Sequence, residues 1–415
     1  MSASTNRVEL RKVCVRSAAA AAVAAFALAG ALRAQTQTQT QTQTTTIEQR
    51  MPRFVNRAQT DLNSRADWVR PAGKPFPLGA ATEPFSITYT HQGQALTLDD
   101  YFRRTDVLGF LVLKDGRTVF ERYLHGTGPS DRYLSMSVSK SVVSVLVGVA
   151  VDEGRIASVN DPVVKYVPRL KSSGYRDATI KDVLHMATGV QFSEEYGSAA
   201  SGIGQLSAAS RTGSPTFEEF AASLPSELAP GTKFNYQSIN TQVLALVLEK
   251  ATGVPLNTYA EEKLWKKIGT ESDAYFLTGK PQPGICAYGC FYATLRDYAR
   301  FGLMAMKGGI LTDQRVVSER WIRDSATPAS FAEPSTDSAT GQCRRGYGLQ
   351  WWIPCGHPGE GAFQAVGING QAIYVNPTRR VVIAQFSAWP QAGASAEIRG
   401  EGNTVFDAIV DRLGK

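Results

Sequence analysis

The sequence predicts an α+β fold in which one antiparallel β-sheet is flanked by helices and carries a mostly helical insertion. Strand patterns occur in two distant parts of the chain, helix patterns fill the section between them, and an amphipathic helix closes the chain. With 415 residues and 43% hydrophobic content, the chain can bury a sizeable core. Strands that are distant in sequence are therefore expected to pair in one sheet.

The first strand pair is expected in LGFLVLKDGRTVFERYL, residues 108–124. Asp115-Gly116 between two apolar runs is a strong hairpin signal. The second strand pair is expected over 371–389, around the turn Asn376-Pro377-Thr378. A final amphipathic helix is predicted over 396–413.

The helices of the middle section are predicted from capping residues at their starts and glycines at their ends. Their expected positions are 138–153 before Gly154, a segment starting at Asp161-Pro162, 179–189 with Thr179 as cap, 238–253 ending at Gly253, and 294–309 with Thr294 and Asp297 in capping positions.

The N-terminal residues 1–34 are typical of a secretory signal peptide. Basic residues from Arg7 to Arg16 precede an alanine-rich apolar run over 17–32, which is too short and too weakly apolar for a stable anchor; a retained anchor is the alternative. The repeat QTQTQTQTQTTT follows, so residues 35–60 are expected to be a low-complexity linker, and residues 61–415 are expected to form one folded domain. We expect a periplasmic or secreted protein with no membrane span after signal cleavage.

Charge and cysteine content narrow the possible partners. The signal segment carries +4 of the formal +7, and the remaining chain has no block of basic residues, so nucleic acid is not an expected partner. Four cysteines remain once Cys14 is removed with the signal, and an even number in an exported protein predicts disulfides. We expect near neighbours to pair, Cys286 with Cys290 and Cys343 with Cys355. A zinc site is the alternative, although the spacing does not match a CxxC pair.

A Ser-x-x-Lys motif, Ser137 to Lys140, lies at the start of the apolar helix 138–153. Residues three apart in the first turn share a face, so the hydroxyl and the amine can meet. A lysine beside such an apolar helix is expected to be partly buried, which lowers its pKa and allows it to take a proton from serine. The structural alternative is a serine cap with a lysine that reaches to solvent.

Several segments in order resemble the serine β-lactamase and penicillin-binding protein superfamily over about residues 100–410. They are SMSVSKS, TIKDVLHMATGVQF, PGTKFNYQSINTQVLALVLEKATG, ATLRDYARFGLMAMKGG, GYGLQWW and AVGINGQAIYVNP. Within it, the chain is most similar to the class C-like branch of D-alanyl-D-alanine carboxypeptidases, esterases and 6-aminohexanoate-dimer hydrolases. The resemblance implies a β-lactamase/transpeptidase-like fold.

The resemblance also implies roles for individual residues. Ser137 is expected to be the nucleophile, Lys140 its base, and Tyr236 the residue that passes a proton to the leaving group. Ser238 replaces the asparagine that usually follows this tyrosine, as in the esterase and aminohexanoate-dimer hydrolase branch. The N–H of Ile368 is expected to form the oxyanion hole with that of Ser137.

Two further positions bear on the substrate. The strand motif at Ala365-Val366-Gly367 lacks the usual basic residue, which argues against a penicillin-like substrate, while Gly367 fits a close approach of backbone to substrate. Tyr196 matches a substrate-contacting tyrosine. Residues 197–217 contain no carboxylate to hold an ammonium group, and the charge in that range is Arg211. This favours a neutral ester or amide.

Other functional classes are less well supported. A Ser-His-Asp hydrolase would have to use one of four histidines, at 91, 125, 185 and 357, without a GxSxG motif. A metallohydrolase lacks HExxH. A carboxypeptidase or β-lactamase, and a non-catalytic penicillin-binding-like module, stay as alternatives. The aromatic GYGLQWW is expected to pack in the core. The sequence thus predicts a carboxylesterase or amidase for small-molecule substrates, with no metal or organic cofactor.

Overall fold

A computed structural model of the chain describes residues 45–56, 65–81, 84–279, 284–336, 343–392 and 396–414. The expected signal peptide, 1–34, lies outside these residues, as does most of the expected linker. The folded unit extends from Thr46, earlier than the expected start at residue 61. Helix α2 (Ile47–Phe54) begins this unit, and the short strand β1 (Val55–Asn56) pairs with β7 (Arg132–Leu134). Residues 46–56 therefore belong to the fold.

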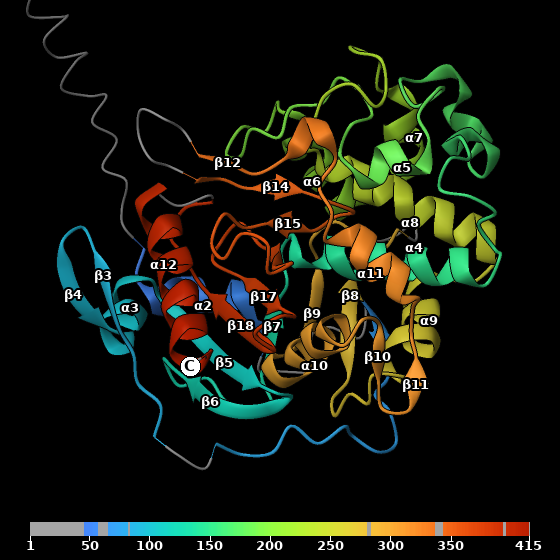
Figure 1. Ribbon diagram of the computed structural model, residues 1–415. Helices are drawn as coiled ribbons and strands as arrows, with labels where there is room; N and C mark the ends of the chain where they lie inside the picture. Colours follow the sequence, from blue (N-terminus) through green and yellow to red (C-terminus); the bar gives the residue numbers. More distant parts are fainter. Residues whose placement is uncertain are drawn as a thin grey trace, which may run out of the picture. The chain divides into compact units, whose positions relative to one another are not determined.

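The main sheet is antiparallel and joins strands from both parts of the sequence, as predicted. Its order is β14-β15-β16-β17-β18-β5-β6, and strands of both parts lie side by side in Figure 1. The strands are β5 (Val107–Lys114), β6 (Arg117–Tyr123), β14 (Gly346–Tyr347), β15 (Trp352–Ile353), β16 (Phe363–Val366), β17 (Ala372–Asn376) and β18 (Val381–Ser387). The predicted hairpin turn is confirmed, because Asp115 and Gly116 both have positive φ, 54° and 83°.

Each face of this sheet is covered by helices because its central strands are apolar on both sides. On β18, Val382 faces α10 (Leu295–Met306), whereas Ile383 faces α12 (Ala396–Leu413) and α3 (Leu98–Arg104). Figure 1 shows α12 lying along β17 and β18. Consecutive residues of one strand thus belong to two separate hydrophobic clusters.

A second antiparallel sheet, which was not predicted, positions the segments around Ser137. Its order is β1-β7-β9-β8-β2, with β2 (Ala66–Val69), β8 (Ala274–Leu277) and β9 (Phe291–Thr294). Three short hairpins complete the strands: β3 (Thr88–His91) with β4 (Gln94–Thr97), β10 (Ile310–Leu311) with β11 (Gln314–Arg315), and β12 (Ser335–Thr336) with β13 (Cys343–Arg344).

Most of the predicted helices are confirmed, and two differ. The remaining α-helices are α4 (Val138–Asp152), α5 (Ile180–Leu184), α6 (Gly202–Thr212), α7 (Phe217–Ser223), α8 (Ser238–Thr252), α9 (Leu256–Ala260) and α11 (Glu319–Ser325). Short 3-10 turns cover Val163–Lys165, Pro168–Ser172 and Ser330–Ala332, and a π-helical turn covers Glu261–Trp265. The predicted helix 179–189 ends at Leu184 because Met186 has φ 56°, outside the helical region. The segment after Asp161-Pro162 forms only a 3-10 turn.

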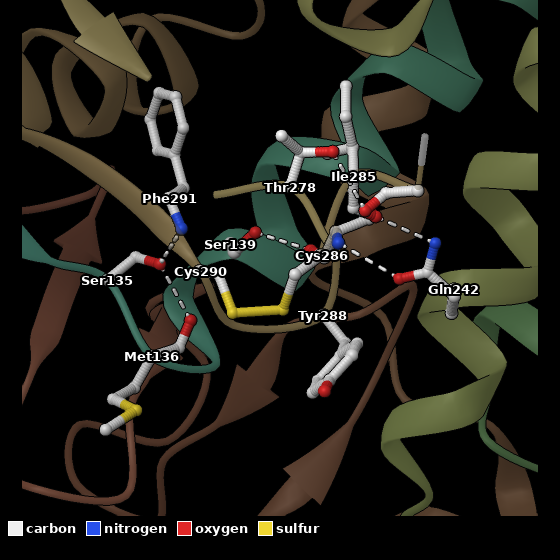
Figure 2. Close-up of a disulfide and its surroundings, with 12 residues drawn as sticks. Ser135, Met136, Ser139, Gln242, Thr278, Ile285, Cys286, Tyr288, Cys290 and Phe291 are labelled. Atoms are coloured by element: carbon white, nitrogen blue, oxygen red, sulfur yellow. Dashed lines mark hydrogen bonds between the residues drawn. A yellow bond between two sulfur atoms is a disulfide. The ribbon is translucent and has the colours of Figure 1, made fainter. Parts of the chain in front are cut away.

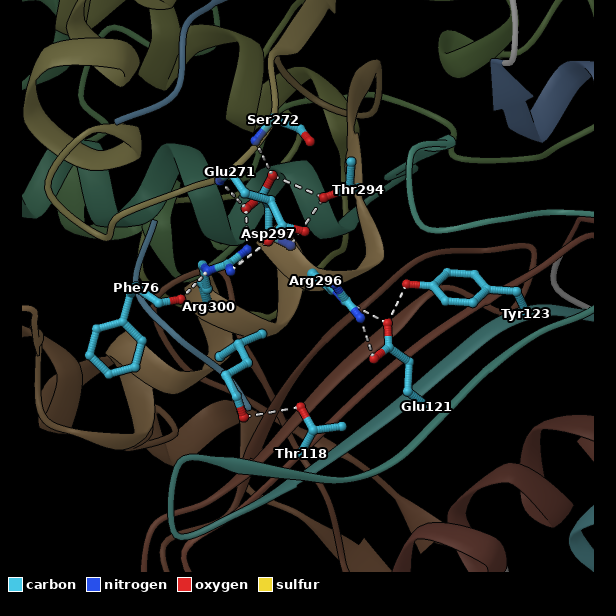
Figure 3. A network of polar contacts seen from close by, with 11 residues as sticks. Phe76, Thr118, Glu121, Tyr123, Glu271, Ser272, Thr294, Arg296, Asp297 and Arg300 are labelled. Carbon is cyan, nitrogen blue, oxygen red and sulfur yellow. Dashed lines mark hydrogen bonds and ion pairs between the residues drawn. The ribbon is translucent and has the colours of Figure 1, made fainter. Parts of the chain in front are cut away.

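A buried polar network fixes α10 against its neighbours (Figure 3). Asp297 accepts hydrogen bonds from the backbone N–H groups of Glu271 and Ser272, at 2.9 and 3.1 Å, and pairs with Arg300 at 2.8 Å. Arg296 on the same helix pairs with Glu121 of β6 at 2.7 Å. Because every charge in this group is paired, the network positions α10 without leaving a charge unpartnered.

The predicted disulfides are both present, joining Cys286 to Cys290 and Cys343 to Cys355. In the part of the chain that the structure describes, no helix has the length and apolar character needed to cross a membrane.

Candidate active site

Ser137 lies where a strand of the second sheet turns into a buried helix. Ser135 directly follows β7, and its N–H donates to the Phe291 carbonyl of β9 at 2.7 Å. Met136 then adopts φ 44°, an uncommon left-handed conformation for a residue with a side chain, and Ser137 occupies the cap position of α4. The Ser137 side chain is therefore partly exposed at the N-terminus of α4, whereas the residues that follow it in the helix are buried.

Lys140 is one helical turn further and is only 1% exposed. Its Nζ donates to Ser137 Oγ at 3.0 Å and to the Tyr288 carbonyl at 2.6 Å. Burial lowers the pKa of Lys140 to about 8, while the negative charge of Glu194 acts in the opposite direction. A substantial fraction of this lysine is therefore neutral near pH 8 and can accept a proton from Ser137.

The Cys286–Cys290 disulfide closes the loop that carries the Tyr288 carbonyl (Figure 2). Ser139, on α4, donates to the Ala287 carbonyl of this loop. Gln242, on α8, accepts from the Ala287 N–H at 3.0 Å and donates to the Ile285 carbonyl at 2.9 Å. The loop is thus held by two helices and one disulfide, and it fixes one of the two acceptors of Lys140.

Tyr236 lies two residues before α8, and its ring is close to the Lys140 amine. Lys140 Nζ is 5.3 Å from the centroid of its ring, and Trp352 stacks on the ring at 5.4 Å with an interplanar angle of 26°. Burial and the charge of Glu194 raise the pKa of Tyr236, whereas its interaction with the Ser137 hydroxyl and the charge of Arg345 lower it. The phenol is therefore protonated at neutral pH and can act as a proton donor.

Glu194 is a site residue that sequence reasoning missed. Its carboxylate accepts from the N–H and Oγ of Ser238, at 2.8 and 2.6 Å, and from the Tyr196 hydroxyl at 2.6 Å. The N–H group belongs to the first residue of α8, where the helix dipole favours an anion. Glu194 lies just ahead of the 197–217 range that lacks carboxylates, and its place two residues before Tyr196 was the available signal.

The loop after β16 carries Ile368, which lines the same cavities as Ser137. A Cβ atom on Gly367 would lie 2.5 Å from Gln371 Oε1 and 2.9 Å from the Ser135 carbonyl, so only glycine permits this approach. Among the described residues, neither the Ser137 N–H nor the Ile368 N–H donates to a protein acceptor. Both donors are thus available to a substrate oxygen.

Two cavities meet at this point. The first cavity has a volume of about 280 Å³, and Tyr236, Arg345, Trp352, Gln364 and Arg399 are among the residues that line it. The second cavity has a volume of about 600 Å³, and its lining includes Ser207, Arg211, Ser238 and Tyr288. Ser137, Tyr196 and Ile368 line both. Ser137 therefore lies where the two cavities adjoin.

Several expectations can be compared with this geometry. No histidine lines either cavity, which counts against a Ser-His-Asp triad. Ala365 is 1% exposed and packs in the core, and it does not line a cavity. The two tryptophans of the aromatic segment 346–352 differ: Trp351 is fully buried, as expected, whereas Trp352 lines the first cavity.

Within the described residues, no cluster of three or more histidine, cysteine or acidic side chains is arranged to hold a metal ion.

Known proteins share this architecture. The profile of the beta-lactamase family matches residues 98–402. A 6-aminohexanoate-dimer hydrolase from Paenarthrobacter ureafaciens is 34% identical over 300 residues, which cover 71% of this chain and 75% of the relative. Among solved structures, a Bacillus anthracis protein assigned as a 6-aminohexanoate-dimer hydrolase superposes with a TM-score of 0.72 at 24% identity, over 84% of this chain and 91% of that one.

A D-stereospecific amidohydrolase from Streptomyces shares the fold at lower similarity, with a TM-score of 0.54 and 20% identity over 71% of this chain and 93% of the other. The predicted fold is thereby confirmed. With the family profile spanning most of the folded unit, the chain belongs to the β-lactamase family, the superfamily of serine hydrolases that it was expected to resemble.

Proposed function

We propose that this protein is an exported serine hydrolase that cleaves an ester or amide bond through an acyl-enzyme on Ser137. The neutral amine of Lys140 takes the Ser137 proton, and Oγ attacks the substrate carbonyl. The N–H groups of Ser137 and Ile368 bind the oxyanion. Tyr236 donates a proton to the departing alcohol or amine, and water then releases the acid and regenerates the serine.

The observation that carries this proposal is the contact between Lys140 Nζ and Ser137 Oγ, 3.0 Å long, at the junction of the two cavities. Lys140 is 1% exposed, its pKa is lowered, and it lies beside a partly exposed serine. This combination is typical of a catalytic base, whereas a lysine with a purely structural role usually keeps its amine in solvent. Tyr236, with its ring against the same amine, supplies the third group. A module that only binds ligands does not require this arrangement.

Amide and ester substrates are supported by the relatives and by the site. The Paenarthrobacter relative is a 6-aminohexanoate-dimer hydrolase, and a dimer of an amino acid is joined by an amide bond. In a carboxypeptidase or β-lactamase, a strand cation near position 365 would bind the substrate carboxylate, but Ala365 is apolar and buried. The cation that those enzymes place on this strand is thus replaced here by Ala365, which favours an esterase or amidase with a differently built binding site over an enzyme for penicillin-like substrates.

Export is supported by the N-terminal sequence and by the disulfides. Residues 1–34 have the pattern of a signal peptide, and the two cysteine pairs are joined in the fold. Structural disulfides form and persist in oxidising compartments. We infer a periplasmic or secreted location.

The proposal is tested by active-site labelling and kinetics. Intact-mass spectrometry after incubation with a fluorophosphonate should show one adduct on the wild-type protein and none on Ser137→Ala, which should also lose hydrolysis of short p-nitrophenyl esters. The exposed Ser130→Ala variant is the matched control and should label normally. A penicillin adduct would favour the β-lactamase alternative, whereas ester hydrolysis retained by Ser137→Ala would refute the mechanism.

A further inference from the structure

The first cavity contains a cation for which the described part of the chain offers no counterion. Arg345 lies between β13 and β14, is partly buried, and lines this cavity. No hydrogen bond or ion pair joins its guanidinium to another described residue. Two more deeply buried arginines are paired: Arg300, 3% exposed, with Asp297 and Glu271, and Arg50, 11% exposed, with Asp106. Because buried charges are normally paired, and the described residues supply no partner for Arg345, this guanidinium is suited to an anion supplied by a ligand.

The guanidinium is held in a fixed position relative to the reacting groups. Its central carbon lies 4.8 Å from the centroid of the Trp352 ring, and Trp352 in turn stacks on Tyr236. A planar guanidinium stacked on an aromatic ring retains N–H donors along its edge. The stack therefore orients a cation toward the same cavity that Tyr236 faces.

A second hydrogen-bond donor without a partner among the described residues, Gln364 Nε2, lies on the strand next to Trp352. Gln364, on β16, is the register partner of Trp352 and is 2% exposed. Its Nε2 is buried without a hydrogen-bond partner among the described residues, and the side chain lines the first cavity. A buried donor without a partner is costly unless a ligand supplies the acceptor. Arg345 and Gln364 thus call for the same kind of ligand atom, a hydrogen-bond acceptor.

The electrostatics of the first cavity favour an anion. Arg399 of α12 also lines it. Burial, and to a smaller extent the charge of Arg399, lower the pKa of Arg345 to about 10. No aspartate or glutamate is among the lining residues. Apolar side chains, such as Val366 and Phe406, complete the wall. This combination fits a short apolar arm that ends in an anionic group.

We propose that Arg345, assisted by Gln364, binds a carboxylate on the leaving group of the substrate. The inference rests on the proposed function. Tyr236, the proton donor to the leaving group, lines the first cavity and not the second, so the leaving group enters the first and the acyl group the second. A guanidinium edge matches the two oxygens of a carboxylate. The substrate class is therefore an ester or amide of a hydroxy or amino acid, cleaved to release that carboxylated fragment.

The test compares two esters that differ only at the end of the leaving group. We choose 3-acetoxybenzoate, which carries a carboxylate, and 3-acetoxybenzamide, its neutral analogue, with rates corrected for their alkaline hydrolysis. Wild-type kcat/KM should be at least tenfold higher for the carboxylate, as expected for a charge-assisted hydrogen bond. In Arg345→Met this preference should be lost, because the side chain keeps its length but not its charge. Arg344→Met, which changes an exposed neighbour, should keep both rates and the preference.

A binding measurement separates this inference from the proposed function. In the Ser137→Ala background, calorimetry should show tighter binding of 3-acetoxybenzoate than of the amide, and Arg345→Met should abolish the difference. No preference in the wild type, or a preference that survives Arg345→Met, would overturn the carboxylate site. Turnover retained by Ser137→Ala would instead overturn the acyl-enzyme proposal, while the binding result would still decide the role of Arg345.

Discussion

The lowered pKa of Lys140 predicts how activity depends on pH. Only the neutral amine can accept the Ser137 proton, and burial lowers the lysine pKa from 10.5 to about 8. At pH 7 the neutral fraction is then roughly one in ten, against about one in 3,000 for an unshifted lysine, so burial makes the base about 300-fold more available. Activity should fall about tenfold for each pH unit below this value.

The assay is kcat/KM for p-nitrophenyl acetate from pH 5.5 to 10 at constant ionic strength, corrected for spontaneous hydrolysis. We expect a rise with an inflection near pH 8 and then a plateau, because the raised pKa of Tyr236 keeps its phenol protonated throughout. An inflection near 6.5 would indicate a histidine base, and one above 10 would indicate an unperturbed lysine. Either result would refute the reasoning.

Glu194 provides an independent check on the same inflection. Its charge raises the pKa of Lys140, so Glu194→Gln should move the inflection to lower pH while retaining an oxygen that can accept from Ser238. The neighbouring Glu195 is exposed and does not contribute to the lysine pKa, so Glu195→Gln should leave the inflection in place. Equal shifts in both variants would contradict the assigned role of Glu194.

Two further substitutions test the loop that carries the Ile368 N–H and the loop that carries the Tyr288 carbonyl. Gly367→Ala places a Cβ within 2.5 to 2.9 Å of its neighbours, so it should displace the oxyanion donor and lower kcat by about 10²- to 10³-fold, whereas Gly128→Ala, with open space around it, should not. Unchanged kcat would exclude this role for the loop. The double variant Cys286→Ser and Cys290→Ser releases the loop that carries the Tyr288 carbonyl, the acceptor of Lys140. Its rate of labelling by a fluorophosphonate should fall severalfold, and its free energy of unfolding, measured with denaturant, should fall by about 2 kcal/mol. Wild-type labelling by this variant would show that the loop is not needed.

Elements with strong local signals could be predicted from the sequence. The hairpin at Asp115-Gly116 and the helix end at Gly253 both require a positive φ, which glycine and turn residues supply cheaply. The second sheet could not be predicted in this way, because strands such as β7 and β9 are short and their pairing joins distant residues. The alternation of apolar residues is too brief there to mark a strand.

In the candidate site, too, some residues had a sequence signal and others had none. Ser137 and Lys140 share one helical turn, so their contact follows from spacing, and Tyr236 was found through the family resemblance. The acceptor on Tyr288 is a backbone carbonyl and has no side-chain signature. Arg345 had no signal in the sequence, because an arginine beside a glycine is ordinary until the fold shows that the described residues contain no counterion for it.

The most direct test of the account is to trap the acyl-enzyme. Rapid quenching of the wild-type protein with p-nitrophenyl acetate, followed by peptide mapping, should place the acetyl group on the peptide that contains Ser137. The rate of its formation should be about 50-fold lower at pH 6 than at pH 8, as the neutral fraction of Lys140 falls. Product formation without an adduct on Ser137, or an acetyl group on another residue, would contradict the account.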